Sequence, residues 1–298
     1  MGLAPNWLRG CATALVTPMH ADGSMDRGAL RRIVDHQVAG GVKILVPVGT
    51  TGESATSTAE EDIETIRTVI EQSNGRAKVI AGIGSNNTAV AIANGKRAAD
   101  AGADALLAVA PYYNKPTQAG LLAHYRAIAA STDLPIVIYN VPGRTVTNIS
   151  AETTLELAET VDNIVATKEA SGNFGQIMQI LAHRPDGFRV ISGDDATTLP
   201  LIALGVDGVI SVNSNQVPGM MNDMVEAALA GRWDEARTLH YRMLDLMEGN
   251  FVETSPGPVK AGLAMMGLCE EHVRLPLVPP SQATKDKMRR WLTDLGAL

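Results

Sequence analysis

Lys168 is the residue whose type and position best suit covalent chemistry in this sequence. It follows the apolar run Ile164-Val165-Ala166 and precedes Glu169-Ala170-Ser171-Gly172. A lysine at the end of a buried strand loses part of its hydration, which favours the neutral amine and lowers its pKa. A neutral amine can attack a carbonyl carbon and form a Schiff base. The alternatives are a lysine that snorkels to solvent and a structural ion pair with Glu169.

Other polar groups could act on the same carbonyl substrate. Thr50 and Thr51 open a small-residue turn that could hold a carboxylate through its amides, or could be an ordinary glycine turn. Tyr139 could donate and accept a proton, or could be a core tyrosine with its hydroxyl satisfied. Arg144 follows a Pro-Gly pair on a predicted loop and could bind a substrate carboxylate, or could lie at the surface.

These groups follow short apolar runs that recur along the first three quarters of the chain. The runs are nearly continuous rather than alternating, which is typical of parallel strands buried on both faces. The predicted strands are Ala12–Thr17, Lys43–Gly49, Ala77–Gly84, Asp104–Ala110, Pro135–Val141, Ile164–Ala170, Phe188–Gly193 and Gly208–Val212.

Amphipathic segments separate these runs. Thr58 begins a capping-box pattern, and glycines at Gly40-Gly41, Gly102 and Gly205 end helices just before strands. Eight alternating strand–helix units without a long linker favour a closed (β/α)₈ barrel (TIM barrel) over a doubly wound sheet, which would also call for an early Gly-x-Gly-x-x-Gly. Barrel enzymes of this kind place their active sites at the carboxyl ends of the strands, so the polar groups should converge there.

The last quarter of the chain predicts helices at 217–249, 257–268 and 281–296. Alone, these helices would bury little apolar surface. We therefore expect one domain over 1–298, with the barrel core at 1–216 and the last barrel helix and a C-terminal helical extension at 217–298.

The composition of this 298-residue chain argues against several classes of partner and bound group. Its formal charge of −7 argues against nucleic-acid binding, and it contains no apolar run long enough for a membrane span. Cys11 and Cys269 are isolated, and the six histidines are scattered, so we expect neither a metal site nor a disulfide framework. Without a signal-peptide pattern, the expected location is the cytoplasm.

Two stretches resemble a known family. Lys168-Glu169-Ala170-Ser171-Gly172 resembles the Schiff-base lysine motif of the dihydrodipicolinate synthase and N-acetylneuraminate lyase family, and Gly49-Thr50-Thr51-Gly52-Glu53 resembles its carboxylate loop. The similarity extends from Leu15-Val16-Thr17-Pro18 to Arg274-Leu275-Pro276. The double threonine and the stretches 111–116 and 139–145 favour the synthase branch of that family.

The resemblance implies a lyase that forms a Schiff base between Lys168 and pyruvate, whose carboxylate Thr51 would hold. The resulting enamine would add to L-aspartate 4-semialdehyde, with Arg144 meeting the carboxylate of that substrate. The product would be 4-hydroxy-tetrahydrodipicolinate, on the route to diaminopimelate and lysine. No external cofactor is implied, because the imine itself is the electron sink.

The resemblance also implies a proton relay of Tyr139, Thr50 and Tyr113, with Tyr113 donated across a subunit interface. It implies a homotetramer built as a dimer of dimers. The backbone carbonyls of Gly193 and Ile210 would line the site.

In one respect the chain departs from family members that lysine inhibits. Their inhibitor pocket contains a histidine and a glutamate, and the matching residues here are Ala59 and Val90. We therefore expect weak or absent inhibition by lysine. Two alternatives stay open: a sister pyruvate-dependent aldolase that acts on a 2-keto-3-deoxy sugar acid, and a barrel that has lost catalysis and serves as a binding or regulatory protein.

Overall fold

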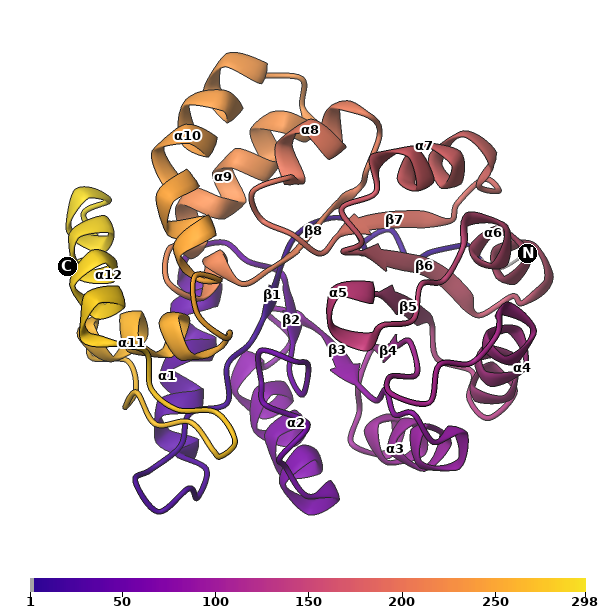
Figure 1. The fold of residues 1–298 in the computed structure, drawn as a ribbon, viewed down its shortest axis with the longest axis horizontal. Coiled ribbons are helices and arrows are strands. Elements are labelled where there is room, and N and C mark those ends of the chain that lie inside the picture. Colours follow the sequence, from indigo (N-terminus) through magenta and orange to yellow (C-terminus); the bar gives the residue numbers. More distant parts are fainter. Residues whose placement is uncertain (1–2) are drawn as a thin grey trace.

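The chain forms a closed barrel of parallel strands. The computed structural model describes residues 3–298. Within this range eight strands follow one another around the barrel in sequence order, and β1 pairs with β8 to close it (Figure 1). The predicted (β/α)₈ class is confirmed. The strands are β1 Gly10–Ala14, β2 Ile44–Val46, β3 Lys78–Gly82, β4 Ala105–Val109, β5 Ile136–Asn140, β6 Ile164–Glu169, β7 Arg189–Ser192 and β8 Gly208–Ser211.

Each strand overlaps its predicted run, but all eight end earlier at the carboxyl end. For β1, the ladder ends at Ala14 rather than at Thr17. The reason is visible at Val16, whose backbone N–H donates to the Asn215 side chain instead of to a neighbouring strand. Apolar character therefore continues beyond the ladder, into the segments that form the mouth of the barrel.

Helices surround the barrel and separate it from solvent (Figure 1). They leave the strands buried on both faces, which is why the strand sequences are nearly continuous in apolar residues. The surrounding helices are α1 Arg27–Ala39, α2 Ala59–Ser73, α3 Thr88–Asp100, α4 Gln118–Ala129, α6 Ala151–Thr160, α7 Phe174–His183, α8 Thr198–Ala203 and α9 Pro218–Leu229.

Local signals set the helix ends. Thr58 caps α2 with the complete capping box, in which Glu61 returns the bond to the Thr58 backbone. Gly41, Gly102 and Gly205 all have positive φ, the conformation that glycine adopts without a steric penalty. The predicted helix start and the predicted glycine exits are confirmed.

The C-terminal extension differs from the prediction in one detail. The segment 217–249 is two helices rather than one, α9 and α10 (Trp233–Gly249), because Gly231 turns the chain with φ +77°. Helices α11 (Gly257–Met265) and α12 (Gln282–Asp294) follow, and α12 packs against α10 and α11 at one side of the barrel (Figure 1). Across residues 3–298, the helices lack the length and apolar content that crossing a membrane requires.

Candidate active site

The pleat of β6 directs Lys168 and Glu169 to opposite faces of the barrel wall. Successive side chains of a strand alternate between its two faces. Lys168 pairs in register with Tyr139 of β5, and Glu169 pairs with Asn140. Lys168 and Tyr139 line the cavity inside the barrel, whereas Glu169 contacts the surrounding layer. The strand period thus brings one amine and one phenol together in the barrel mouth.

The amine of Lys168 lies in a buried position beside the Tyr139 ring. Only 5% of the residue is exposed, and its Nζ lies 4.2 Å from the centre of the Tyr139 ring. Burial lowers the pKa of Lys168 from 10.5 to about 8, because the charged amine loses its hydration. The negative charge of Asp195 works in the opposite direction, and the positive charge of Arg144 lowers this pKa further. A substantial share of the amine is therefore neutral near pH 8.

Glu169 does not neutralise this amine. Its carboxylate accepts hydrogen bonds from the Asn140 side chain at 2.7 Å, the Ser171 hydroxyl at 2.6 Å and the Gln176 side chain at 3.0 Å. This network explains how a buried carboxyl is satisfied without a cation. Both alternative interpretations of Lys168 therefore fail, since the lysine is neither paired with Glu169 nor extended into solvent.

Glycine at position 193 makes room for Lys168. A Cβ added to Gly193 would lie 2.9 Å from Lys168 Cε and 2.7 Å from Ala170 Cβ. Contacts this short are repulsive, so any larger residue would displace the amine-bearing chain. Gly193 also belongs to the lining of the cavity.

The phenol of Tyr139 has a hydrogen-bond partner in Thr50. Tyr139 is buried and shares a hydrogen bond with the Thr50 side chain. Burial raises the pKa of Tyr139 to about 12, while the nearby charge of Arg144 and the bond to Thr50 partly oppose the rise. Below that pH the phenol keeps its proton and can donate it.

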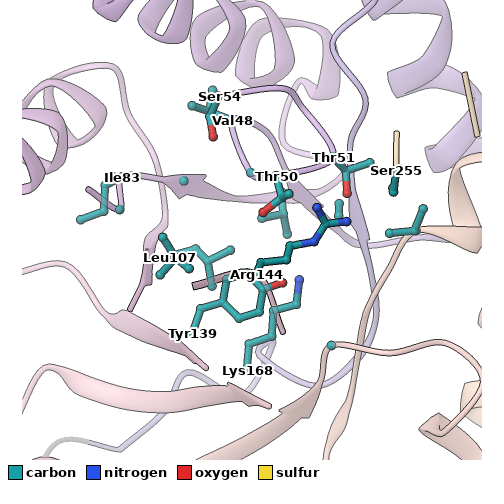
Figure 2. A pocket seen from close by; sticks show the side chains of 18 of the residues that line it. Val48, Thr50, Thr51, Ser54, Ile83, Leu107, Tyr139, Arg144, Lys168 and Ser255 are labelled. Atoms are coloured by element: carbon teal, nitrogen blue, oxygen red, sulfur yellow. The ribbon is translucent and has the colours of Figure 1, made fainter. Parts of the chain in front are cut away.

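The turn that follows β2 presents both threonines to the cavity. The Gly52 N–H donates to the Gly49 carbonyl at 3.0 Å, and the Glu53 N–H donates to the Thr50 carbonyl at 3.1 Å. These two bonds fold the chain tightly between Gly49 and Glu53. Figure 2 shows Thr50 and Thr51 at the upper edge of the cavity, opposite Lys168.

Arg144 belongs to a short helix rather than to the predicted loop. Helix α5 (Pro142–Thr145) begins with proline, and Val146, which follows its last residue, has φ +60°. The Thr145 hydroxyl donates to the Thr147 carbonyl at 2.9 Å and fixes the chain beyond the helix. As a result the Arg144 side chain extends over Lys168 toward Thr51 (Figure 2).

These side chains surround one cavity of about 110 Å³, which has room for several water molecules or one small metabolite. Two of its lining residues, Phe251 and Ser255, come from the segment between α10 and α11, and two others, Asp62 and Asn94, come from α2 and α3. None of the four was predicted from the sequence. Their side chains follow no predicted strand, and only the closed barrel places them at its mouth. The lining also includes Val48, Thr50, Thr51, Ser54, Tyr139, Arg144, Lys168, Gly193 and Val212.

No role for Asp195 was predicted from the sequence. Its carboxylate accepts the backbone N–H groups of Val212 at 3.0 Å and Asn213 at 2.9 Å, which ties the end of β7 to the end of β8. Burial raises its pKa to about 6, so the group is an anion at neutral pH. It is the acidic neighbour whose charge favours a cationic Lys168. Within residues 3–298, His, Cys, Asp and Glu form no cluster suited to a metal ion.

Two predicted site residues lie outside the cavity lining. Tyr113 follows β4 with φ +73° and is 87% exposed, so its phenol faces away from the interior of its own barrel. Ile210 is buried in β8, paired with Ala12, and Val212 contributes to the lining further along the same segment. The structure therefore brings Lys168 and Tyr139 together with the two threonines, Arg144 and Gly193.

The fold and the site define a parallel (β/α)₈-barrel protein with a buried lysine of lowered pKa at the carboxyl ends of its strands. The sequence model of the Dihydrodipicolinate synthetase family matches residues 7–295. The chain belongs to this family.

Individual relatives agree with this family assignment. A curated protein from Koribacter versatilis, named 4-hydroxy-tetrahydrodipicolinate synthase, is 50% identical over 98% of this chain and 97% of its own length. The crystal structure of dihydrodipicolinate synthase from Aquifex aeolicus is 42% identical and superposes with a TM-score of 0.95 over 97% of this chain and 99% of that one. A chloride-inhibited dihydrodipicolinate synthase from Acinetobacter baumannii, complexed with pyruvate, is 41% identical, with a TM-score of 0.95 over 98% and 100% of the two chains.

Proposed function

We propose that this protein condenses pyruvate with L-aspartate 4-semialdehyde through a Schiff base on Lys168. This is the 4-hydroxy-tetrahydrodipicolinate synthase activity for which the curated relatives are named. The observation that carries the proposal is the buried Lys168 amine, with its pKa lowered to about 8, beside the Tyr139 phenol.

The first half-reaction joins pyruvate to the enzyme. The neutral amine of Lys168 attacks the keto carbon, and the carbinolamine then loses water to become an iminium. The Thr51 hydroxyl and the neighbouring amides hold the pyruvate carboxylate. Tyr139, bonded to Thr50, gives a proton to the departing hydroxyl. Asp195 stabilises the positive charge that the iminium carries.

The second half-reaction forms the carbon–carbon bond. Tyr139, left without its proton by the first half-reaction, takes a proton from the methyl group of the iminium, which becomes an enamine. The enamine carbon attacks the aldehyde of the second substrate, and the aldehyde oxygen takes the proton from Tyr139. Arg144 binds the carboxylate of that substrate at the mouth of the cavity. The amino group of the substrate then attacks the imine carbon and displaces Lys168, which regenerates the free amine. The backbone carbonyl of Gly193 belongs to the proposed site, because Gly193 lines the cavity, whereas the predicted contribution of Ile210 lacks this support.

The proposal includes a subunit arrangement. Tyr113 is exposed on its own barrel, which suits a residue that completes the relay of a neighbouring subunit. We propose a homotetramer built from two such dimers. We also propose that residues 1–298 act as one domain, because the segment after α10 supplies Phe251 and Ser255 to the cavity.

Borohydride reduction in the presence of pyruvate tests the chemistry. We expect one reduced adduct per chain, mapped to the peptide that carries Lys168, with Lys43 and Lys115 unlabelled. An adduct on another lysine, or no adduct, would contradict the proposal. A parallel assay with aspartate semialdehyde and with 2-keto-3-deoxy sugar acids separates the synthase from the sister aldolase, since only the synthase consumes the semialdehyde efficiently.

A further inference from the structure

The residue that ends the threonine turn, Glu53, has an unusual setting. Its backbone adopts φ +58°, a strained conformation for a non-glycine residue that persists only when its surroundings impose it. Only 4% of the residue is exposed, and Glu53 is not part of the cavity lining. Its carboxylate therefore faces away from the substrate space, in the interior of the protein.

The partners of this carboxylate all come from the C-terminal extension. The Lys260 Nζ of α11 donates to Glu53 Oε1 at 2.6 Å, and the Arg274 N–H donates to Oε2 at 2.9 Å. Lys260 also donates to the His272 carbonyl at 2.6 Å. The side chains of Glu53 and Lys260 are 1% and 0% exposed, so this is a fully buried ion pair between residues 207 positions apart.

Arg274 extends the same attachment. Its guanidinium donates to the Thr56 carbonyl at 2.9 Å, to the Gly23 carbonyl at 2.7 Å and to the Glu61 carboxylate. The chain just beyond the threonine turn is thus held at two points by one segment of the extension. That extension also provides Phe251 and Ser255 to the cavity wall.

Stability alone gives a weak reason for such a pair. Removing two charges from water carries a large desolvation cost, and well-packed apolar residues at the same place are often equally stable or more so. A hydrogen-bonded ion pair does, however, fix the distance between the two chain segments that carry its charges, and their relative orientation. The turn it fixes carries Thr50, the partner of Tyr139, and Thr51.

We propose that the Glu53–Lys260 pair positions the Thr50-Thr51 turn for the first substrate, which makes the C-terminal extension a working part of the active site. Glu53 and Lys260 are positioning residues, since neither lines the cavity. The inference rests on the proposed function, because it assigns the turn to the pyruvate carboxylate.

Steady-state kinetics of Glu53→Gln test the proposal. The amide keeps the shape of the side chain and one acceptor oxygen but removes the charge. We expect kcat/KM for pyruvate to fall about tenfold or more, because small misplacements of binding groups are costly. We expect kcat/KM for the semialdehyde to change less than about threefold, since Arg144 binds it from a different element. In a variant that is merely less well folded, kcat/KM for pyruvate and kcat/KM for the semialdehyde would decrease equally.

Two further variants keep the test decisive. Lys260→Met leaves a buried, unpaired carboxylate and should be strongly destabilised. Glu53→Gln/Lys260→Met removes both charges, so it should recover stability while kcat/KM for pyruvate stays low. Lys285→Met is the matched control: it breaks the Lys285–Glu271 pair of the same extension without removing any partner of Glu53, and should leave both kcat/KM values unchanged.

The outcomes separate this inference from the proposed function. If wild-type protein gives no adduct with pyruvate and borohydride, the proposed function fails. If it does, and the folded Glu53→Gln or double variant reaches the wild-type kcat/KM for pyruvate, the positioning role is overturned. Failure of both variants to fold would also overturn it, because the pair would then be structural.

Discussion

The Lys168 amine lies 4.2 Å from the centre of the Tyr139 ring, on the strand next to it and in the same register. The electron-rich face of an aromatic ring attracts a cation, so the Tyr139 ring partly compensates the charged amine for its lost hydration. The position therefore allows both states that a Schiff-base lysine needs, the neutral nucleophile and the cationic iminium.

The pKa of Lys168 sets the pH dependence of imine formation. The neutral amine is the nucleophile, so the rate of borohydride-trapped adduct formation should rise with pH up to about 8 and then level off. Below that pH the rate should fall about tenfold per pH unit. Rapid-quench trapping with pyruvate at a series of pH values measures this profile. A midpoint near 10.5, the ordinary value for lysine, would show that burial does not tune the amine.

Tyr139→Phe separates proton transfer from binding. Loss of the phenol should lower kcat by about 10²–10⁴-fold, the usual contribution of a general acid or base. Pyruvate should still be trapped on Lys168, although more slowly. Tyr125→Phe is the matched control, because Tyr125 is fully buried and its hydroxyl donates to the Ala108 carbonyl at 3.4 Å, away from the cavity lining. Equal losses in the two variants would argue against a catalytic phenol.

Asp195→Asn tests the electrostatic role of the buried acid. The amide oxygen can still accept the Val212 and Asn213 amides, so the link between β7 and β8 should persist. Without the negative charge, the pKa of Lys168 should decrease, and the trapping profile should move to lower pH. The iminium should also be less stable, which lowers kcat. Asp194 is an exposed neighbour of Asp195, and Asp194→Asn should leave the pH profile unchanged. An identical shift of the profile in Asp194→Asn would show that the net surface charge, rather than the buried acid, sets the pKa of Lys168.

Mixed subunits test the proposed contribution of Tyr113. Lys168→Ala and Tyr113→Phe should each be strongly impaired as pure proteins. After unfolding and refolding together in equal amounts, half of the dimers should contain one of each chain. One site in each such dimer would be intact, because an isologous interface exchanges the same residue in both directions. We therefore expect about one quarter of wild-type activity. No gain over the separate variants would place Tyr113 outside the neighbouring site.

Lysine inhibition should be weak or absent. Val90 lies in the first turn of α3 and Ala59 begins α2, and neither side chain can pair with an ammonium or hydrogen-bond to it. A titration of the initial rate with L-lysine measures the effect, and Val90→Glu is the informative variant because it adds a carboxylate. Strong inhibition of the wild-type protein at sub-millimolar lysine would contradict this expectation.

The sequence alone determined the barrel and the position of its lysine. Continuous apolar runs indicate strands buried on both faces, and glycines after helices mark the returns to the barrel, because both signals are local. The alternation along β6 then places Lys168 and Glu169 on opposite faces whatever the rest of the chain does. Helix α5 and the break at Gly231 were missed, since each depends on a single turn whose conformation neighbouring residues decide.

Only the tertiary structure decided what surrounds the amine. The charge of the buried Asp195 affects the pKa of Lys168. The burial of Asp195 depends on every element packed around β7 and β8. Glu53 and Lys260 are 207 residues apart and show no common pattern in the sequence; barrel closure and the return of the extension bring them together. Strand periodicity is set by the backbone, whereas the pairing of charges is set by the three-dimensional path of the chain.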